Sequence, residues 1–195
     1  MAAPVIVSAG VASSMNCAQP PMVQMECGRS ASCIRSASPP TTANCQHSEV
    51  SFAIDGAGNL YGTTSQGGAN QCFAGCGTVF ELSPTSTGRW IEKILYNFKF
   101  DSSGFGPGGG VVIDQAGNLY GTTINGGSQN CGCGVVYKLS PQLGGQWQYT
   151  VLHNFIGIDG AQPDANLTLD DNGNIYGTTL TGGPGGAGVV FELTP

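Results

Sequence analysis

A ten-residue phrase occurs three times along this chain, and no other feature limits its fold as strongly. Asp-Gly-Ala-Gly-Asn-Leu-Tyr-Gly-Thr-Thr occupies residues 55–64, and close variants occupy residues 114–123 and 170–179. The copies start 59 and 56 residues apart. Self-similarity at a period of this order predicts a stacked array of small structural units, each of which buries an apolar face against its neighbour.

The similarity extends beyond this phrase and predicts four strands per repeat. A short apolar run precedes each Asp, the phrase itself ends in a strand-like run, and a Gly-Gly pair leads to a third run that closes at Pro84, Pro141 and Pro195. A fourth run covers residues 90–98 and 147–155, and the third copy stops before it. The runs lack helical periodicity and are separated by Gly, Pro, Asn and Ser. Because four antiparallel strands make one blade of a β-propeller, we expect an all-β fold of propeller-like blades in an incomplete array.

The fourth run of each repeat alternates between apolar and polar residues. Such alternation predicts one apolar face that packs on a neighbouring sheet. The side chains predicted to share this face are Trp90, Ile94, Tyr96 and Phe98 in the first copy and Trp147, Val151, His153 and Phe155 in the second.

The motif Tyr-Gly-Thr-Thr-x-x-Gly-Gly, followed by Gly-(Thr/Val)-Val-(Phe/Tyr)-x-Leu-(Ser/Thr)-Pro, resembles the GloVer-type tandem repeats of bacterial extracellular proteins. The resemblance covers about residues 51–195. It implies a secreted or surface-anchored, propeller-like array, and it transfers no catalytic residues to particular positions.

The period divides the repeat domain, residues 51–195, into blades at about 51–110 and 111–166 and a truncated blade at 167–195. Closed propellers usually have about four to eight blades. Terminal repeats of an array need a cap or a partner, so we expect either self-association that completes the array or a longer protein of which this is a fragment.

Residues 1–50 match no repeat and are predicted to be irregular. One hypothesis is that they are a repeat translated out of frame. Codons read from the third base force Leu at Asn16-Cys17 and Gly at Met22-Val23, as in a repeat, and a segment of that origin would be disordered. The alternative is a divergent cap or linker.

Composition excludes several classes of function. Charged residues make up only 9% of the chain and the formal net charge is −6, with six Lys and Arg in all, which argues against nucleic-acid binding. No apolar run approaches the roughly 20 residues that span a bilayer. The start of the chain has no recognisable signal peptide. High Gly content with few charges nevertheless favours an extracellular or cell-surface β protein. No phosphate loop or dinucleotide fingerprint is present, and we expect no cofactor and no metal.

Four cysteines of the repeat domain occupy the same connection in adjacent repeats. In an oxidising compartment they would form disulfides, with three possible pairings. Free thiols and a zinc site of four thiolates are the alternatives. These candidates are Cys72, Cys76, Cys131 and Cys133. The third repeat has Ala187 at the position of Cys76 and Cys133, so the repeats carry no ring of cysteines.

Two sets of carboxylates are candidates for chemistry. Asp55, Asp114 and Asp170 recur at one position of every copy, where Asp accepts hydrogen bonds from its own turn, although carboxylate pairs also serve glycosidases. The loop residues that differ between copies are the weak catalytic candidates, namely Asp101, Asp159 and Asp164.

Aromatic residues give the remaining candidates. The recurrent Tyr61, Tyr120 and Tyr176 are weak candidates for stacking on a sugar, or else they pack between blades. His153 replaces Tyr96 of the preceding copy and is expected to be a core residue.

The sequence therefore favours an extracellular repeat module with a binding or scaffold role toward a glycan or protein ligand. The alternative is a glycan-active hydrolase or lyase that uses the loop carboxylates. Propellers host both kinds of function.

Overall fold

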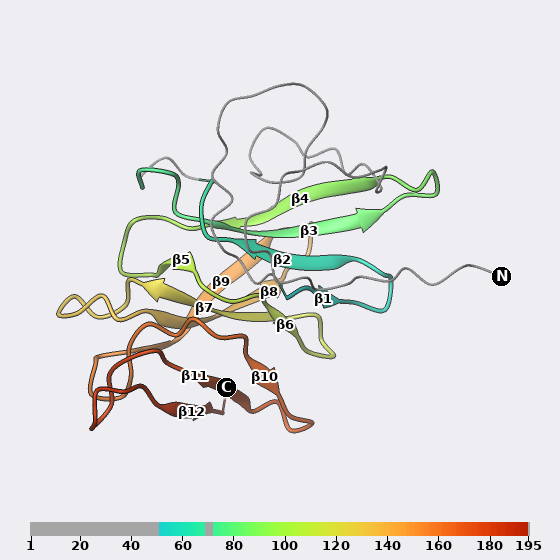
Figure 1. Ribbon diagram of the computed structural model, residues 1–195. Coiled ribbons are helices and arrows are strands. Elements are labelled where there is room, and N and C mark those ends of the chain that lie inside the picture. The colour runs from blue at the N-terminus through green and yellow to red at the C-terminus, as the bar shows by residue number, and fades with distance from the viewer. Residues whose placement is uncertain (1–50, 69–71, 195) are drawn as a thin grey trace, which may run out of the picture.

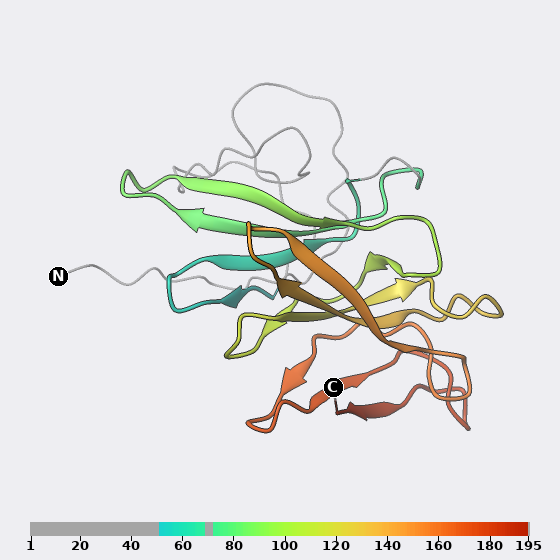
Figure 2. The same cartoon turned by 180° about the vertical axis from the view of Figure 1, so that it is seen from behind.

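The computed structural model describes residues 51–68 and 72–194. That part of the chain contains twelve β-strands in three antiparallel sheets and no helix. The two views in Figure 1 and Figure 2 show the three sheets stacked in chain order, with the second sheet in the middle. The sheets do not close into a barrel within the described residues. The predicted all-β fold of blade-like antiparallel sheets in an incomplete array is confirmed.

The first sheet has the four predicted strands, hydrogen-bonded in chain order. They are β1 (Ala53–Ile54), β2 (Leu60–Thr64), β3 (Thr78–Pro84) and β4 (Trp90–Asn97).

The second sheet repeats this order with β6 (Val112–Ile113), β7 (Leu119–Asn125), β8 (Val135–Pro141) and β9 (Trp147–Asn154). One further strand, β5 (Phe105–Pro107), pairs with the far end of β7. Strand β5 was not predicted from the sequence, and it lies before the expected blade boundary at residue 110.

The third sheet has three strands, β10 (Thr168–Leu169), β11 (Ile175–Thr178) and β12 (Val190–Leu193). They pair in chain order and antiparallel, as β1–β3 do in the first sheet and β6–β8 in the second.

The Gly of each Tyr-Gly-Thr-Thr segment lies opposite an aromatic residue of the next strand. Gly62 pairs with Phe80, Gly121 with Tyr137, and Gly177 with Phe191. A Cβ atom on Gly62 would lie 2.8 Å from the Phe80 ring, so the ring occupies the space that a side chain would need. An aromatic ring that covers a strand glycine compensates for the packing that glycine lacks. The repeated Gly and the repeated aromatic residue are thus two halves of one packing unit.

Two clusters of buried side chains lie between the sheets. Phe98 from the end of β4 packs on Tyr137 of the second sheet, with ring centroids 5.3 Å apart. In the same way Phe155 packs on Phe191 of the third sheet, at 5.2 Å. The first cluster includes Tyr61, Val79, Phe98, Leu119, Tyr137 and Leu139, and the second includes Tyr120, Val136, Phe155, Leu167 and Ile175.

The predicted alternation along β4 and β9 is wrong in its second half. In β9, Tyr137 pairs with Val151 but its neighbour Val136 pairs with His153, so one residue is inserted. This bulge moves His153 to the opposite face from Val151. Val151 and Trp147 pack on the first cluster, while Phe155 joins the second.

The same irregularity in β4 places Tyr96 opposite Val79 and Ile94 opposite Phe80. Ile94 and Tyr96 therefore face opposite sides of the first sheet. The bulge therefore ends the apolar face of the first half of β4, and Tyr96 does not continue it.

The connections fall at two ends of the stack (Figure 1). The turn end consists of five-residue connections, which are residues 55–59, 85–89, 114–118, 142–146 and 170–174. The loop end consists of the longer connections, which are the described residues among 65–77 together with 98–111, 126–134, 155–167 and 179–189. Cysteines and the loop carboxylates lie at the loop end.

Candidate functional site

The repeated Asp organises every connection of the Asp-x-x-Gly-Asn type at the turn end. Asp114 Oδ1 accepts hydrogen bonds from the backbone N–H groups of Ala116 (2.9 Å) and Asn118 (2.8 Å). Its Oδ2 accepts from the Asn118 side chain (2.7 Å) and from the Tyr120 hydroxyl (2.9 Å). Asp55 and Asp170 make the same set of contacts in their sheets. Both oxygens of each carboxylate are therefore engaged within their own turn, which fits the predicted turn role.

These hydrogen bonds determine the acidity of the carboxyl groups. Burial alone would raise the pKa of Asp114, but hydrogen bonds from Asn118, Tyr120 and Ala116 outweigh it and hold the pKa below the usual value. The Asp55 pKa is lowered by the same balance, and the Asp170 pKa is lowered first of all by the Asn174 side chain. Burial, together with the Asp114 carboxylate, raises the pKa of Tyr120 to about 12. Each pair therefore consists of an ionised carboxylate and a neutral phenol, which suits a fixed hydrogen bond.

The three recurrent tyrosines occupy equivalent positions but differ in exposure. Tyr61 and Tyr120 are 6% and 4% exposed, and the Tyr61 ring contacts Trp147 of the second sheet at 6.3 Å between centroids. Tyr176 is partly exposed because the corresponding face of the third sheet carries no further sheet in the described structure. The rings of Tyr61 and Tyr120 thus face neighbouring sheets, and only Tyr176 presents a ring toward solvent.

All four candidate cysteines of the repeat domain form disulfides within their own connection. Cys72 is bonded to Cys76, and Cys131 to Cys133. The expectation of disulfides is confirmed, and the sequence left their pairing open. Cys17, Cys27, Cys33 and Cys45 lie outside the described residues.

Backbone hydrogen bonds link each disulfide loop to the connection that enters the following sheet. The Cys76 carbonyl accepts from the Gly106 N–H of β5, and the Cys133 carbonyl accepts from the Gln162 N–H, both at 2.8 Å. Ala161, next to Gln162, bridges to Thr181 at the edge of the third sheet. The disulfide loops therefore lie at the two joints between consecutive sheets.

The loop carboxylates are separately placed at the loop end. Asp101 accepts a hydrogen bond from the Ser103 N–H at 2.8 Å. Asp164 is exposed, and the space beside the Gly108 Cα is filled by its carboxylate. Asp159 Oδ1 accepts from the Ile156 N–H at 2.8 Å. Two different inter-sheet connections thus carry these three residues.

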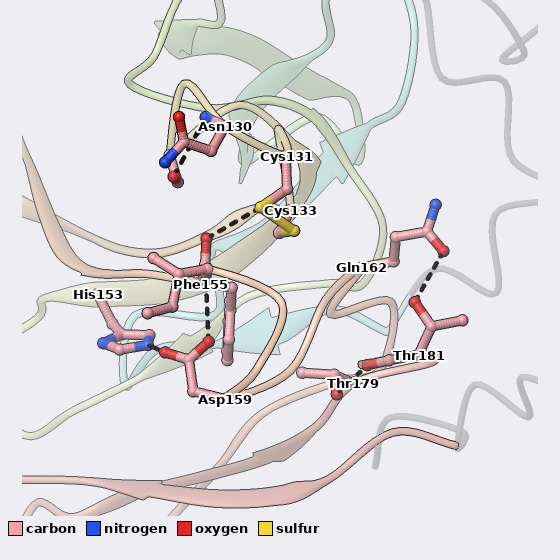
Figure 3. Close-up of a disulfide and its surroundings, with 11 residues drawn as sticks. Asn130, Cys131, Cys133, His153, Phe155, Asp159, Gln162, Thr179 and Thr181 are labelled. Carbon is pink, nitrogen blue, oxygen red and sulfur yellow. Dashed lines mark hydrogen bonds and ion pairs between the residues drawn. A yellow bond between two sulfur atoms is a disulfide. The ribbon is translucent and has the colours of Figure 1, made fainter. Parts of the chain in front are cut away.

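His153 contacts one of these carboxylates. Its Nε2 lies 2.9 Å from Asp159 Oδ2, and both side chains are about one-third exposed, at 33% and 35%. Figure 3 shows this pair on one side of Phe155 and the Cys131–Cys133 disulfide on the other. His153 was expected in the core, but the bulge in β9 brings it to the rim of the second cluster, where it meets a charged partner.

Large apolar side chains are exposed at the loop end, and their exposure was not predicted from the sequence. They lie in Gly-rich connections, outside any strand whose alternation would assign them a face. These residues are Phe73, Phe100, Ile156, Ile158 and Leu180. We call this set the loop-end apolar residues.

The described residues carry neither a metal cluster nor a helix that could span a membrane. No group of three or more His, Cys, Asp or Glu side chains in residues 51–68 and 72–194 is arranged to hold a metal ion. Among the same residues, no helix has the length and apolar character needed to cross a membrane.

The sequence model of the Gloeobacter/Verrucomicrobia repeat matches residues 23–195. The match thus includes all three sheets and begins inside the segment 1–50. No curated protein matches the chain.

Proposed function

Because this chain belongs to the Gloeobacter/Verrucomicrobia repeat family, we propose that its repeats form a framework for a binding module whose loop end contacts a protein ligand. The repeated residues are used within the framework: the Asp turns tie neighbouring strands, and the Gly–aromatic pairs and Tyr61 and Tyr120 pack the sheets. The loop end carries residues that vary from copy to copy, among them Asp101 and Asp159. Variable loops on a rigid scaffold are where binding sites concentrate.

The observation that carries this proposal is the position of the loop-end apolar residues. Ile158 is 77% exposed and Phe100 is 63% exposed, and the loop end carries five of the ten large apolar side chains that are exposed in the described residues. Exposed apolar side chains on a protein surface can serve as contacts for a protein ligand. Aliphatic side chains dominate the set, which favours a protein ligand over a glycan, because glycans stack on the faces of Trp and Tyr.

The joints between sheets support the proposal because they hold the binding loops in place. Each disulfide closes a loop that is hydrogen-bonded through Cys76 or Cys133 to the next connection. Loops fixed in this way lose less conformational entropy on binding a ligand.

Site-specific photo-crosslinking tests this function. A benzophenone amino acid replaces Ile158 at the loop end or, as a matched control, Leu143, which is equally apolar and fully exposed at the turn end. In the cells that encode the chain, we expect a saturable protein adduct from position 158 and none from position 143. Adducts of equal yield from both positions, or none from 158, would contradict the proposal.

The rival function is a glycan-active hydrolase or lyase that uses Asp101, Asp159 and Asp164. The His153–Asp159 contact favours it, since an imidazole–carboxylate pair can move a proton. The test is to incubate the protein with a panel of polysaccharides and to measure released reducing ends or unsaturated products. If such products form and the Asp159→Asn variant no longer forms them, the protein is an enzyme and the binding proposal is wrong. Saturable glycan binding without turnover would instead change the ligand class.

We place the protein outside the cell or on its surface. The two disulfides support this location, because disulfides persist in oxidising compartments. When the producing cells are fractionated, we expect to find the chain in the medium or in the cell envelope.

Self-association is proposed through the outer face of the third sheet. In the first two sheets the face that carries Tyr61 or Tyr120 is covered by the following sheet, whereas Tyr176, Glu192 and Val190 lie on an uncovered face. We expect light scattering to show a dimer or larger species that Tyr176→Lys dissociates. A monodisperse monomer at high concentration would contradict this interface.

A further inference from the structure

The two disulfides occupy equivalent connections but close loops of different length. Cys72 and Cys76 are four residues apart in sequence, whereas Cys131 and Cys133 are two apart. Gly132 lies between the latter two with a φ of 60°, a left-handed conformation that glycine adopts readily. A crosslink stabilises mainly by restricting the unfolded chain, and the restriction is smaller for a shorter loop. The Cys131–Cys133 bond therefore contributes less to the fold than Cys72–Cys76.

Solvent reaches the two bonds differently. Cys131 is exposed, while its partner Cys133 is 6% exposed. In the other loop Cys72 is half-buried and Cys76 is only 1% exposed. Thiol–disulfide exchange requires an incoming thiolate to approach one sulfur along the disulfide, so access to that sulfur limits the rate. Cys131 is the most exposed of the four cysteine residues.

A hydrogen-bond acceptor lies next to the Cys131 sulfur. Cys131 Sγ lies 3.7 Å from the Phe155 carbonyl oxygen, as Figure 3 shows. That carbonyl is held in position, because the Phe155 N–H donates to the Gly134 carbonyl and the next N–H, of Ile156, donates to Asp159. A disulfide sulfur has no proton to donate, whereas the reduced Cys131 thiol would find this acceptor already in place.

The fold at this position does not depend on the sulfur atoms. Ala187 of the third repeat stands where Cys133 stands in the second, and the glycine after it, Gly188, keeps the same positive φ as Gly134. The contact of Cys133 with Gln162 is made by backbone atoms alone. Opening the disulfide therefore leaves the joint between the second and third sheets intact.

We propose that Cys131–Cys133 is a thiol–disulfide exchange site for small thiols, and that Cys72–Cys76 is a structural bond that resists them. A thiolate attacks Cys131 Sγ, forms a mixed disulfide with it and releases Cys133 as a thiolate, which takes a proton from solvent. A second thiol then attacks the sulfur of the first thiol, releases Cys131 and leaves as part of a small-molecule disulfide. Two thiols are oxidised for each protein disulfide reduced.

Differential alkylation of the full chain tests the proposal. The protein is incubated with reduced glutathione, quenched with acid, alkylated and digested with trypsin. Residues 100–138 form one tryptic peptide that contains Cys131 and Cys133 and no other cysteine, and chymotryptic cleavage after Phe73 separates Cys72 from Cys76. We expect Cys131–Cys133 to be reduced at least about tenfold faster than Cys72–Cys76. Equal rates, or faster reduction of Cys72–Cys76, would overturn the proposal.

A pair of variants tests which sulfur is attacked. In Cys133→Ser, oxidised glutathione should convert Cys131 to its glutathione mixed disulfide several-fold faster than it converts Cys72 in the matched variant Cys76→Ser. The glutathione adduct trapped on the unaltered chain should likewise be on Cys131. An adduct found on Cys133, or equal rates in the two variants, would contradict the assignment. Far-UV circular dichroism identifies either variant if it fails to fold.

Discussion

The second and third sheets carry the same motif in different surroundings. Tyr120 in the second sheet is 4% exposed beneath the third sheet, whereas Tyr176, its equivalent, lies partly exposed on the outer face of the stack. Tyr120 donates a hydrogen bond to the Asp of its own turn at 2.9 Å, whereas the Tyr176 hydroxyl lies 3.3 Å from the Asp170 carboxylate and 3.1 Å from that of Glu192. The internal geometry of a sheet therefore forms without a following neighbour, but the burial of its tyrosine requires one.

This difference separates two contributions to stability, the hydrogen bonds within a turn and the burial of apolar side chains, which the repeated sequence does not distinguish. Hydrogen bonds within a turn recur in all three sheets, while the third sheet buries its apolar side chains less, because within the described residues it has neither a following sheet nor a fourth strand. The same substitution should thus cost more in the second sheet than in the third.

The largest contrast is expected at the leucine of the third strand. Leu139 is fully buried in the first cluster, whereas the equivalent Leu193 is only partly buried. Leu139→Ala should lower the free energy of unfolding by about 2–5 kcal/mol, because a buried cavity adds to the lost burial. Leu193→Ala should cost less than half as much. Urea denaturation of both variants checks this, and equal losses would contradict the contrast.

The turn carboxylates should give the next largest effect. Asp114→Ala removes the acceptor of the buried Tyr120 hydroxyl and of two backbone N–H groups, and should cost about 2–3 kcal/mol, since an unpaired buried polar group keeps its full desolvation penalty. Asp170→Ala should cost less, because water can replace the carboxylate at the exposed turn. A larger loss for Asp170→Ala in chemical denaturation would refute the explanation.

The strand glycines should show a smaller contrast. An alanine at Gly121 meets the Tyr137 ring, which is fully buried and has no room to move, so Gly121→Ala should cost about 1–3 kcal/mol. Gly177→Ala meets Phe191, which is only partly buried and can move, and should cost less. Gly185→Ala, with no atom near the added Cβ, is the neutral control. Thermal unfolding measures all three.

The smallest loss of stability is expected at acid pH. Protonation removes the charge of a turn carboxylate, but the side chain keeps its shape and its position in the turn. The folded pKa of Asp55, Asp114 and Asp170 lies below the ordinary value of 3.8. Their contribution is therefore complete above that value and is lost as the pH falls through the folded pKa. Urea midpoints measured from pH 7 to pH 2 should fall at the acid end, less steeply in Asp114→Asn. Constant midpoints would exclude this linkage.

Much of the fold follows from the sequence because each repeated strand has a local signal. Alternation, the Asp-x-x-Gly-Asn turn and the closing Pro predict β1–β4 and their equivalents. Strand β5 was not predicted because Phe105–Pro107 lies in a Gly-rich connection and pairs with a strand that comes later in the chain. The bulges in β4 and β9 were not predicted because the alternation of apolar residues in the sequence continues across the inserted residue.

Less of the candidate site could be predicted. The cysteines and Asp159 were identified by residue type, but the pairing of Cys131 with Cys133 and the contact of Asp159 with His153 depend on the fold of one connection. Exposure of Ile158 and its neighbours is a tertiary property, which no local pattern in a loop encodes.

Nitration of tyrosine in the folded chain at low protein concentration tests whether the three sheets stack on one another. Tetranitromethane followed by peptide mass spectrometry reports each ring separately. The stacked arrangement predicts fast nitration of Tyr176 and protection of Tyr61 and Tyr120, which are 6% and 4% exposed. Nitration of all three tyrosines at similar rates would show that the sheets do not cover one another and would contradict the account.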